Sequence, residues 1–128
     1  MRKIMLVTGG SRGIGAATCL LAAQRGYDVA VNYTRDAQSA GEVVGKVKAA
    51  GGRAVAIRAD VGIESDIIEM FRTVDRELGP LDCLVNNAGI VDVKTRVSDM
   101  GAGYHKPWQR ALETLVRARV TMLVRAPA

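Results

Sequence analysis

The spacing of hydrophobic residues changes repeatedly along the first 93 positions of the chain. Short continuous hydrophobic runs alternate with longer segments in which hydrophobic residues recur every three or four positions. The short runs are typical of strands buried on both faces, and the longer segments are typical of helices with one buried face. The pattern predicts strands at 3–7, 28–32, 53–58 and 81–85, and helices at 14–25, 36–50 and 65–78.

Residues at helical spacing define the face of each predicted helix that we expect to pack against a sheet. They are Ile14, Thr18, Leu21 and Ala22 in the first helix, Ala40, Val43, Val44 and Val47 in the second, and Ile67, Ile68, Phe71, Val74 and Leu78 in the third. A glycine follows each helix, where it favours the helix end. Ser65 is expected either to cap the third helix or to help start it.

The regular alternation of strand and helix predicts an α/β fold with a doubly wound, Rossmann-like parallel sheet. Right-handed crossovers and the glycine-rich first turn support this prediction, and we expect the strand order 3-2-1-4. We expect the sheet to be truncated after the fourth strand, which leaves one edge of that strand open to pairing.

Composition narrows the classes of protein to consider. The chain has 128 residues, of which 48% are hydrophobic and 24% are charged, as in an ordinary globular domain. No run of about 18 hydrophobic residues is present, so no membrane span is expected. Cys19 and Cys83 lie in hydrophobic stretches and predict two buried, reduced thiols in a cytoplasmic protein. With His105 as the single histidine, no metal site is expected.

A glycine-rich segment joins the first predicted strand to the first helix. It reads Thr8-Gly9-Gly10-Ser11-Arg12-Gly13-Ile14-Gly15. Glycines at such a turn let the backbone approach a pyrophosphate closely, and the helix N-terminus supplies free N–H groups and the positive end of a dipole. The segment therefore predicts a dinucleotide site. The alternative is a tight turn with no ligand.

The end of the second strand bears on which dinucleotide binds. About 20 residues after a glycine loop, an acidic residue typically binds the ribose hydroxyls of NAD. Residues 32–35 read Asn-Tyr-Thr-Arg and lack a carboxylate that would repel the 2′-phosphate of NADP. Arg12 and Arg35 carry guanidinium groups suited to that phosphate, although Arg35 can equally be a solvated loop residue. We therefore expect NADP rather than NAD, with Tyr33 and Arg35 beside it.

Further candidate residues follow the third and fourth strands. Asp60 can accept a hydrogen bond from an adenine amino group while Val61 packs on the ring; alternatively, Asp60 only begins a helix. Residues 86–89 read Asn-Asn-Ala-Gly. The asparagines can tie adjacent strands together, and Ala88 and Gly89 leave room for a ribose at the crevice where open parallel sheets bind ligands.

In this order and at these separations, the motifs resemble the short-chain dehydrogenase/reductase family, and most closely its sugar-dehydrogenase and 3-oxoacyl-reductase-like members. The resemblance covers residues 1 to about 98. It implies NADP as the cofactor and hydride transfer between NADPH and a carbonyl or alcohol substrate. Together with the positions found above, it gives the candidate cofactor-binding residues Gly9, Ser11, Arg12, Gly13, Ile14, Gly15, Tyr33, Arg35, Asp60, Val61, Asn87, Ala88 and Gly89.

The catalytic residues that the resemblance implies, an Asn-Ser-Tyr-Lys set, have no counterparts in this sequence. Counted from Trp108, the family's Asn position is occupied by Leu115. None of the tyrosines at 27, 33 and 104 is followed by lysine at the family's Tyr-x-x-x-Lys spacing. We therefore expect no catalytic residue and a cofactor-binding fragment that is inactive alone. The alternative is a non-catalytic NADP-binding or regulatory module.

The chain is expected to divide into a dinucleotide-binding half, 1–93, and a divergent basic tail, 94–128, made of a loop and a helix. The first part carries equal numbers of acidic and basic residues, so the formal net charge of +5 lies entirely in the tail. The tail either binds an acidic partner or arises from a shifted reading frame. Nucleic-acid binding is not expected, because the arginines share no face and aromatic residues do not alternate with them. The oligomeric state is left open, since relatives often pair through later helices.

Overall fold

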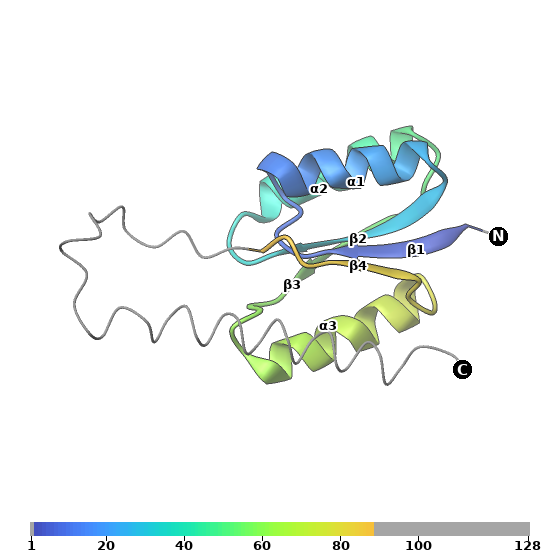
Figure 1. The fold of residues 1–128 in the computed structure, drawn as a ribbon. Helices are drawn as coiled ribbons and strands as arrows, with labels where there is room; N and C mark the ends of the chain where they lie inside the picture. Colours follow the sequence, from blue (N-terminus) through green and yellow to red (C-terminus); the bar gives the residue numbers. More distant parts are fainter. Residues whose placement is uncertain (1, 89–128) are drawn as a thin grey trace, which may run out of the picture.

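The computed structural model describes residues 2–88, which form four strands and three helices in strict alternation (Figure 1). In chain order these are β1 (Lys3–Val7), α1 (Gly13–Gln24), β2 (Tyr27–Tyr33), α2 (Ala37–Ala49), β3 (Ala54–Arg58), α3 (Glu64–Glu77) and β4 (Cys83–Val85). The predicted loop and helix of the basic tail lie outside the described residues.

The four strands form one parallel sheet in the order β3-β2-β1-β4. This confirms the predicted doubly wound fold and its strand order. Figure 1 shows α1 and α2 covering one face of the sheet and α3 covering the other. Among residues 2–88, no helix has the length and hydrophobicity needed to cross a bilayer.

Alternate residues of β1 supply the two hydrophobic cores on opposite faces of the sheet. Ile4 and Leu6 belong to the core under α3, and Met5 and Val7 belong to the core under α1 and α2. Because successive side chains of a strand point to opposite faces, a strand covered on both sides is hydrophobic at every position. This explains the continuous hydrophobic runs in the sequence.

The predicted buried face of α1 is wrong at two positions. Ile14 is 80% exposed and Leu21 is 49% exposed. The buried residues of α1 are instead Gly15, Cys19, Ala22 and Ala23. All of these are small, because α1 begins directly against the glycine-rich turn and packs closely on the sheet. Of the predicted face, Ala22 is buried.

The faces predicted for α2 and α3 are largely confirmed. In α2, Ala40, Val43 and Val47 are buried. In α3, the predicted residues Ile67, Phe71 and Val74 are buried together with Met70, which the prediction omitted. Ser65 does not cap α3: the helix begins at Glu64, and Ile63 stands at the N-cap position without a side-chain hydrogen bond.

A buried carboxylate, Asp28, ties the amino-terminal ends of the sheet together. Its side chain is only 2% exposed and lies between two arginines. Arg2 Nε is 2.9 Å from Oδ1, Arg53 Nε is 3.0 Å from Oδ2, and the Arg53 backbone N–H donates to Oδ1 at 2.8 Å. Burial raises the pKa of Asp28, but the hydrogen bonds and charges of Arg53 and Arg2 outweigh it and hold the pKa below its ordinary value.

Candidate functional site

The glycine-rich turn lies at the carboxyl ends of β1, β2 and β4. The backbone N–H of Thr8 donates to the carbonyl of Val85 at 3.1 Å, which joins the turn to β4. On the other side, the N–H of Gly10 donates to the carbonyl of Asn32 at 2.8 Å, which joins it to β2. Candidate residues from three separate segments are therefore brought to one edge of the sheet, where open α/β sheets bind their ligands.

Thr8 and Asn87 lock the turn to the segment after β4. Thr8 Oγ1 accepts hydrogen bonds from the backbone N–H groups of Asn87 and Ala88, both at 3.0 Å. Asn87 Nδ2 in turn donates to the carbonyls of Thr8 and Gly9, both at 3.1 Å. The expectation that an asparagine ties adjacent strands together is confirmed for Asn87. Its neighbour Asn86 has a buried side-chain oxygen that accepts no hydrogen bond within residues 2–88.

Asn32 is a site residue whose role the sequence did not reveal. Its side chain is buried, and Oδ1 accepts a hydrogen bond from the N–H of Gly9 at 3.1 Å. Nδ2 donates to the carbonyls of Ile57 at 3.3 Å and Ala59 at 3.1 Å. One amide therefore holds the glycine-rich turn and the end of β3 in fixed positions relative to β2. The signal available in the sequence was a polar residue at the end of a hydrophobic strand segment.

Replacing Asn32 with alanine is expected to lower the free energy of unfolding by about 2–3 kcal/mol, because it leaves buried N–H and C=O groups without partners. Urea unfolding followed by circular dichroism measures this loss. Thr34→Ala is the control, since Thr34 is exposed two positions further on. Equal unfolding free energies for the two variants would contradict the role given to Asn32.

Two glycines of the turn have structural reasons to be glycine. Gly9 has a φ of 62°, in the region that residues with a β-carbon rarely adopt. A β-carbon on Gly15 would lie 2.6 Å from Asn87 Nδ2 and closer still to the carbonyl of Gly9. The first turn of α1 therefore lies directly against the Thr8–Asn87 network. The backbone conformation at position 9 and the close contact at position 15 therefore explain why these two residues are glycine.

Within residues 2–88, no side chain caps the N-terminus of α1. Its N-cap residue, Arg12, makes no side-chain capping hydrogen bond, and the first turn contains no acidic residue. The free N–H groups and the positive end of the helix dipole are therefore available to an anion. Ser11 precedes Arg12 and is partly buried, whereas Arg12, Gly13 and Ile14 are exposed.

The candidate residues that follow β2 and β3 lie beside the same edge. Tyr33 is partly buried and Arg35 is exposed. The N–H of Ala59 donates to the carbonyl of Tyr33 at 3.0 Å, so the segment leading to Asp60 and Val61 continues alongside β2. Gly89 lies outside the described residues.

Asp60 has the helix-entry role considered as the alternative reading. Its Oδ1 accepts a hydrogen bond from the N–H of Gly62 at 2.8 Å, and its own N–H donates to Asp66 Oδ2 at 2.9 Å. These bonds shape the turn into α3. Since Asp60 is exposed and Oδ2 accepts no hydrogen bond from residues 2–88, that oxygen remains available to a ligand. The structural role and the ligand role are therefore compatible.

The two thiols differ in their surroundings. Burial raises the pKa of the Cys19 thiol to about 12, and its Sγ lies 3.9 Å from the carbonyl oxygen of Gly10. Cys19 is therefore a packing residue beneath the glycine-rich turn. Cys83 is only partly buried, so the prediction of two buried thiols holds for Cys19 alone. Residues 2–88 contain no group of three side chains placed to hold a metal ion.

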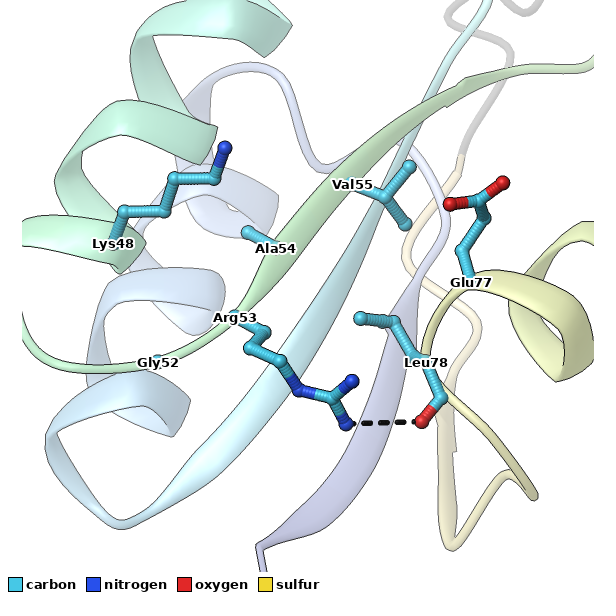
Figure 2. A pocket seen from close by; sticks show the side chains of 7 residues that line it. All are labelled: Lys48, Gly52, Arg53, Ala54, Val55, Glu77 and Leu78. Atoms are coloured by element: carbon cyan, nitrogen blue, oxygen red, sulfur yellow. Dashed lines mark hydrogen bonds between the residues drawn. The ribbon is translucent and has the colours of Figure 1, made fainter.

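A pocket of about 450 Å³ lies at the opposite end of β3 from Asp60 (Figure 2). It is lined by Lys48, Gly52, Arg53, Ala54, Val55, Glu77 and Leu78. Figure 2 shows the guanidinium group of Arg53 hydrogen-bonded to the carbonyl of Leu78, a distance of 3.0 Å. Because Arg53 also binds Asp28, its charge is already engaged within the fold. The pocket contains none of the candidate residues.

Comparisons with known proteins give a consistent result. The sequence model of the short chain dehydrogenase family matches residues 3–126. The uncharacterized oxidoreductase YgfF of Escherichia coli (strain K12) is 48% identical over 99 residues, which cover 77% of this chain and 40% of YgfF. The short-chain dehydrogenase/reductase homolog YusS of Bacillus subtilis (strain 168) is 48% identical over 90 residues, which cover 70% of this chain and 83% of YusS.

Solved structures agree with the sequence relatives. A short chain dehydrogenase from Burkholderia cenocepacia J2315, crystallised in complex with NADP, superposes with a TM-score of 0.80 and is 39% identical. The match covers 97% of this chain and 49% of that protein. This chain thus spans 40% of YgfF and about half of the Burkholderia protein, but most of YusS.

Proposed function

Since the chain belongs to the short-chain dehydrogenase/reductase family, we propose that residues 1–93 bind NADP(H) at the carboxyl edge of the sheet. In a whole oxidoreductase of this family, the bound cofactor would exchange hydride with a carbonyl or alcohol substrate. The proposal rests above all on the uncapped N-terminus of α1 beside the glycine-rich turn. A pyrophosphate is an anion that such a helix end accommodates.

The residues present fit a dinucleotide in shape as well as in charge. A β-carbon at Gly13 would meet nothing within 4 Å, so the backbone at the start of α1 is open to a pyrophosphate, whereas Gly9 and Gly15 let the turn pack closely against its neighbours. Thr8 and Asn87 hold this backbone in place through the hydrogen bonds described above. Because the donors are positioned before the ligand arrives, binding requires little reordering of the turn. Ser11 and Ile14 stand at the same end of α1.

The preference for NADP over NAD is assigned to arginines near the end of β2. Arg12 and Arg35 are both exposed, and each carries a charged, planar group that can bind the 2′-phosphate through two hydrogen bonds. Tyr33, the last residue of β2, is assigned to the same end of the cofactor. The Burkholderia relative crystallised with NADP supports this choice.

The remaining candidate residues are assigned to the adenosine half of the cofactor. Asp60 accepts from the adenine amino group through its free oxygen, and Val61 packs on the adenine ring. Asn87, Ala88 and Gly89 lie at the adenosine ribose and the neighbouring backbone. The half-buried position of Asn87 and Ala88 next to Gly9 supports this arrangement.

We further propose that these 128 residues bind the cofactor without turning over a carbonyl substrate. Reduction of a carbonyl requires a proton donor within hydrogen-bonding distance of its oxygen. In this family the donor is the tyrosine of Tyr-x-x-x-Lys, and none of the three tyrosines here has that spacing. Sequencing the gene through and beyond codon 128 tests the relation to a whole enzyme, because a Tyr-x-x-x-Lys in any downstream frame would support it.

A non-catalytic NADP-binding or regulatory module is the second candidate. The missing Tyr-x-x-x-Lys favours it as well. A gene without any downstream Tyr-x-x-x-Lys would favour the module over the enzyme. Measurable NADPH-dependent carbonyl reduction by the 128-residue chain would contradict both.

Replacing Arg12 with alanine is expected to weaken NADPH binding about tenfold, since one charge-assisted contact to the 2′-phosphate is lost. NADH lacks that phosphate, so its dissociation constant should change by less than about twofold. Fluorescence of the reduced nicotinamide during titration measures both constants.

Arg25→Ala is the matched control for this prediction. Arg25 is exposed at the C-terminal end of the same helix, far from its N-terminus. The Arg25→Ala substitution should leave the dissociation constants for NADPH and NADH unchanged. A parallel loss of NADPH and NADH affinity in Arg12→Ala would contradict the assignment of Arg12 to the 2′-phosphate.

A further inference from the structure

The outer edge of β3 carries backbone groups that no other strand within residues 2–88 uses. Only β2 pairs with β3, which is the last strand on its side of the sheet. Just before β3 the carbonyl of Arg53 accepts from β2, and just after it the N–H of Ala59 donates to β2, both at 3.0 Å. Because backbone groups alternate in direction along a strand, Ala54, Ala56 and Arg58 direct their N–H and C=O groups outward. These groups are available to an additional strand.

A cavity lies against this edge. The pocket of about 450 Å³ described above is lined by β3 and by the C-terminal ends of α2 and α3 (Figure 2). Its lining includes Ala54 and Val55, which are partly buried. Ala54 packs with the core under α1 and α2, and Val55 packs with the core under α3. An additional strand beside β3 would therefore find space at this end and a hydrophobic side chain to cover on each face of the sheet.

The charges around the pocket leave one cation without a partner in the described part of the chain. Figure 2 shows Lys48 of α2 and Glu77 of α3 on either side of β3. Glu77 Oε1 lies 3.5 Å from Arg76 Nε, and the charge of Arg53 is engaged by a buried carboxylate, as described above. Lys48 is exposed and forms no ion pair with any of residues 2–88.

A second cation stands at the other end of the same edge. Arg58 is the last residue of β3, it is exposed, and its Nε donates to the carbonyl of Thr34 at 3.3 Å. It too forms no ion pair inside the described range 2–88. Ala54 and Arg58 are four positions apart, so their side chains lie on the same face of the strand, separated by about 13 Å. An additional strand would thus pass one positive side chain at each end.

We propose that the edge of β3 binds an extended segment of a partner protein that carries two acidic side chains four positions apart. The backbone of this segment pairs with the outward N–H and C=O groups of β3, as in other cases of strand addition. Its acidic side chains lie near Lys48 and Arg58, and the hydrophobic side chains between them cover Val55. A second copy of this chain is disfavoured, because its own edge would bring the same two cations together. Residues 94–128 are disfavoured because they carry the formal net charge of +5.

A short peptide of matching pattern tests this proposal. The probe is Glu-Val-Ala-Val-Glu with blocked ends, added to the isotope-labelled 128-residue chain and followed by NMR spectra of the backbone amides. We expect saturable shifts that are largest for Ala54, Ala56 and Arg58. The same peptide with lysine in place of both glutamates should bind about tenfold more weakly. Equal affinity for the two peptides, or no shift of the β3 amides at millimolar peptide, would overturn the proposal.

Two variants separate backbone pairing from charge. Ala56→Pro removes an outward N–H but none of the bonds to β2, and proline is tolerated on edge strands in that orientation. It should weaken binding of the acidic peptide at least about tenfold. Lys48→Glu, which alters no backbone group, should weaken it about fivefold. Amide spectra of each variant without peptide show whether the sheet is intact.

Lys46→Glu is the matched control for Lys48→Glu. Lys46 is also exposed in the last turn of α2, but it lies two positions away on another side of the helix and does not line the pocket. Its substitution changes the net charge equally and should alter the affinity for the acidic peptide by less than about twofold. Equal losses in the two lysine variants, or unchanged affinity in a folded Ala56→Pro chain, would contradict strand addition at this edge.

Discussion

Replacing Gly15 with alanine is expected to weaken NADPH binding by at least about a hundredfold and to destabilise the fold by about 1–3 kcal/mol. The added methyl group would meet the carbonyl of Gly9 and the side-chain nitrogen of Asn87, which is 2.6 Å from the new β-carbon. Neither partner can retreat easily. The Gly9 carbonyl belongs to the backbone, and the Asn87 amide is held by two hydrogen bonds. The helix must therefore move away from the turn, and the pyrophosphate donors move with it.

Gly45→Ala is the matched control for this substitution. Gly45 lies in the middle of α2, it is exposed, and a β-carbon there would have nothing within 4 Å. Because alanine favours helices more than glycine does, this variant should be more stable by about 0.5–1 kcal/mol. Its affinity for NADPH should be unchanged. A Gly15→Ala chain that binds NADPH normally would show that the contact between α1 and the turn does not position the cofactor.

Replacing Asp28 with asparagine is expected to lower the free energy of unfolding at pH 7 by about 2–3 kcal/mol. The carboxylate is buried, and the asparagine NH₂ group would face a guanidinium N–H instead of accepting from it. The loss is limited because the side chains of Arg2 and Arg53 are 35% and 61% exposed, so water can solvate them. Urea unfolding measures the difference.

The same substitution should change the pH dependence of stability. The pKa of Asp28 is lower in the folded chain than its ordinary value of 3.8. Such a group stabilises the fold above pH 3.8, and its contribution is lost as the pH falls through the folded pKa. The difference between the unsubstituted chain and Asp28→Asn should therefore shrink below about pH 4.

Glu69→Gln is the control for Asp28, because Glu69 pairs with Arg72 at 3.8 Å on the surface, where both side chains are more than 60% exposed. Glu69→Gln should change the free energy of unfolding by no more than about 0.5 kcal/mol, both at pH 7 and at pH 3. A difference for Asp28→Asn that is constant between pH 7 and pH 3 would contradict the ionised, arginine-bound state of Asp28.

The sheet was predictable because local signals agreed with its topology. Each strand is a short hydrophobic run, a glycine lies two positions after the last residue of each helix, and the helices are long enough to cross between parallel strands. The buried face of α1 was not predictable in the same way. The hydrophobic residues of this helix are not confined to one face, so their spacing does not identify the buried side. Only the packing of α1 against the glycine-rich turn explains why Gly15 is buried while Ile14 is exposed.

The candidate site was predictable where it depends on the backbone and not where it depends on distant side chains. The glycine spacing indicated a phosphate-binding turn because few other residues tolerate that geometry. The role of Asn32 depends on carbonyls 25 and 27 residues away, which only the pairing of β2 with β3 brings within reach. Asp28 likewise meets Arg2 and Arg53 from 26 and 25 residues away. Its position inside a hydrophobic run was a signal that a buried charge needed partners.

The proposed function requires that the described fold bind a nicotinamide dinucleotide and favour the phosphorylated form. Titration of the purified 128-residue chain with NADPH, and in parallel with NADH, tests it most directly. We expect saturable binding of one NADPH per chain, with a lower dissociation constant for NADPH than for NADH. Absence of NADPH binding at millimolar concentration, in a chain that unfolds cooperatively on heating, would contradict the proposed function.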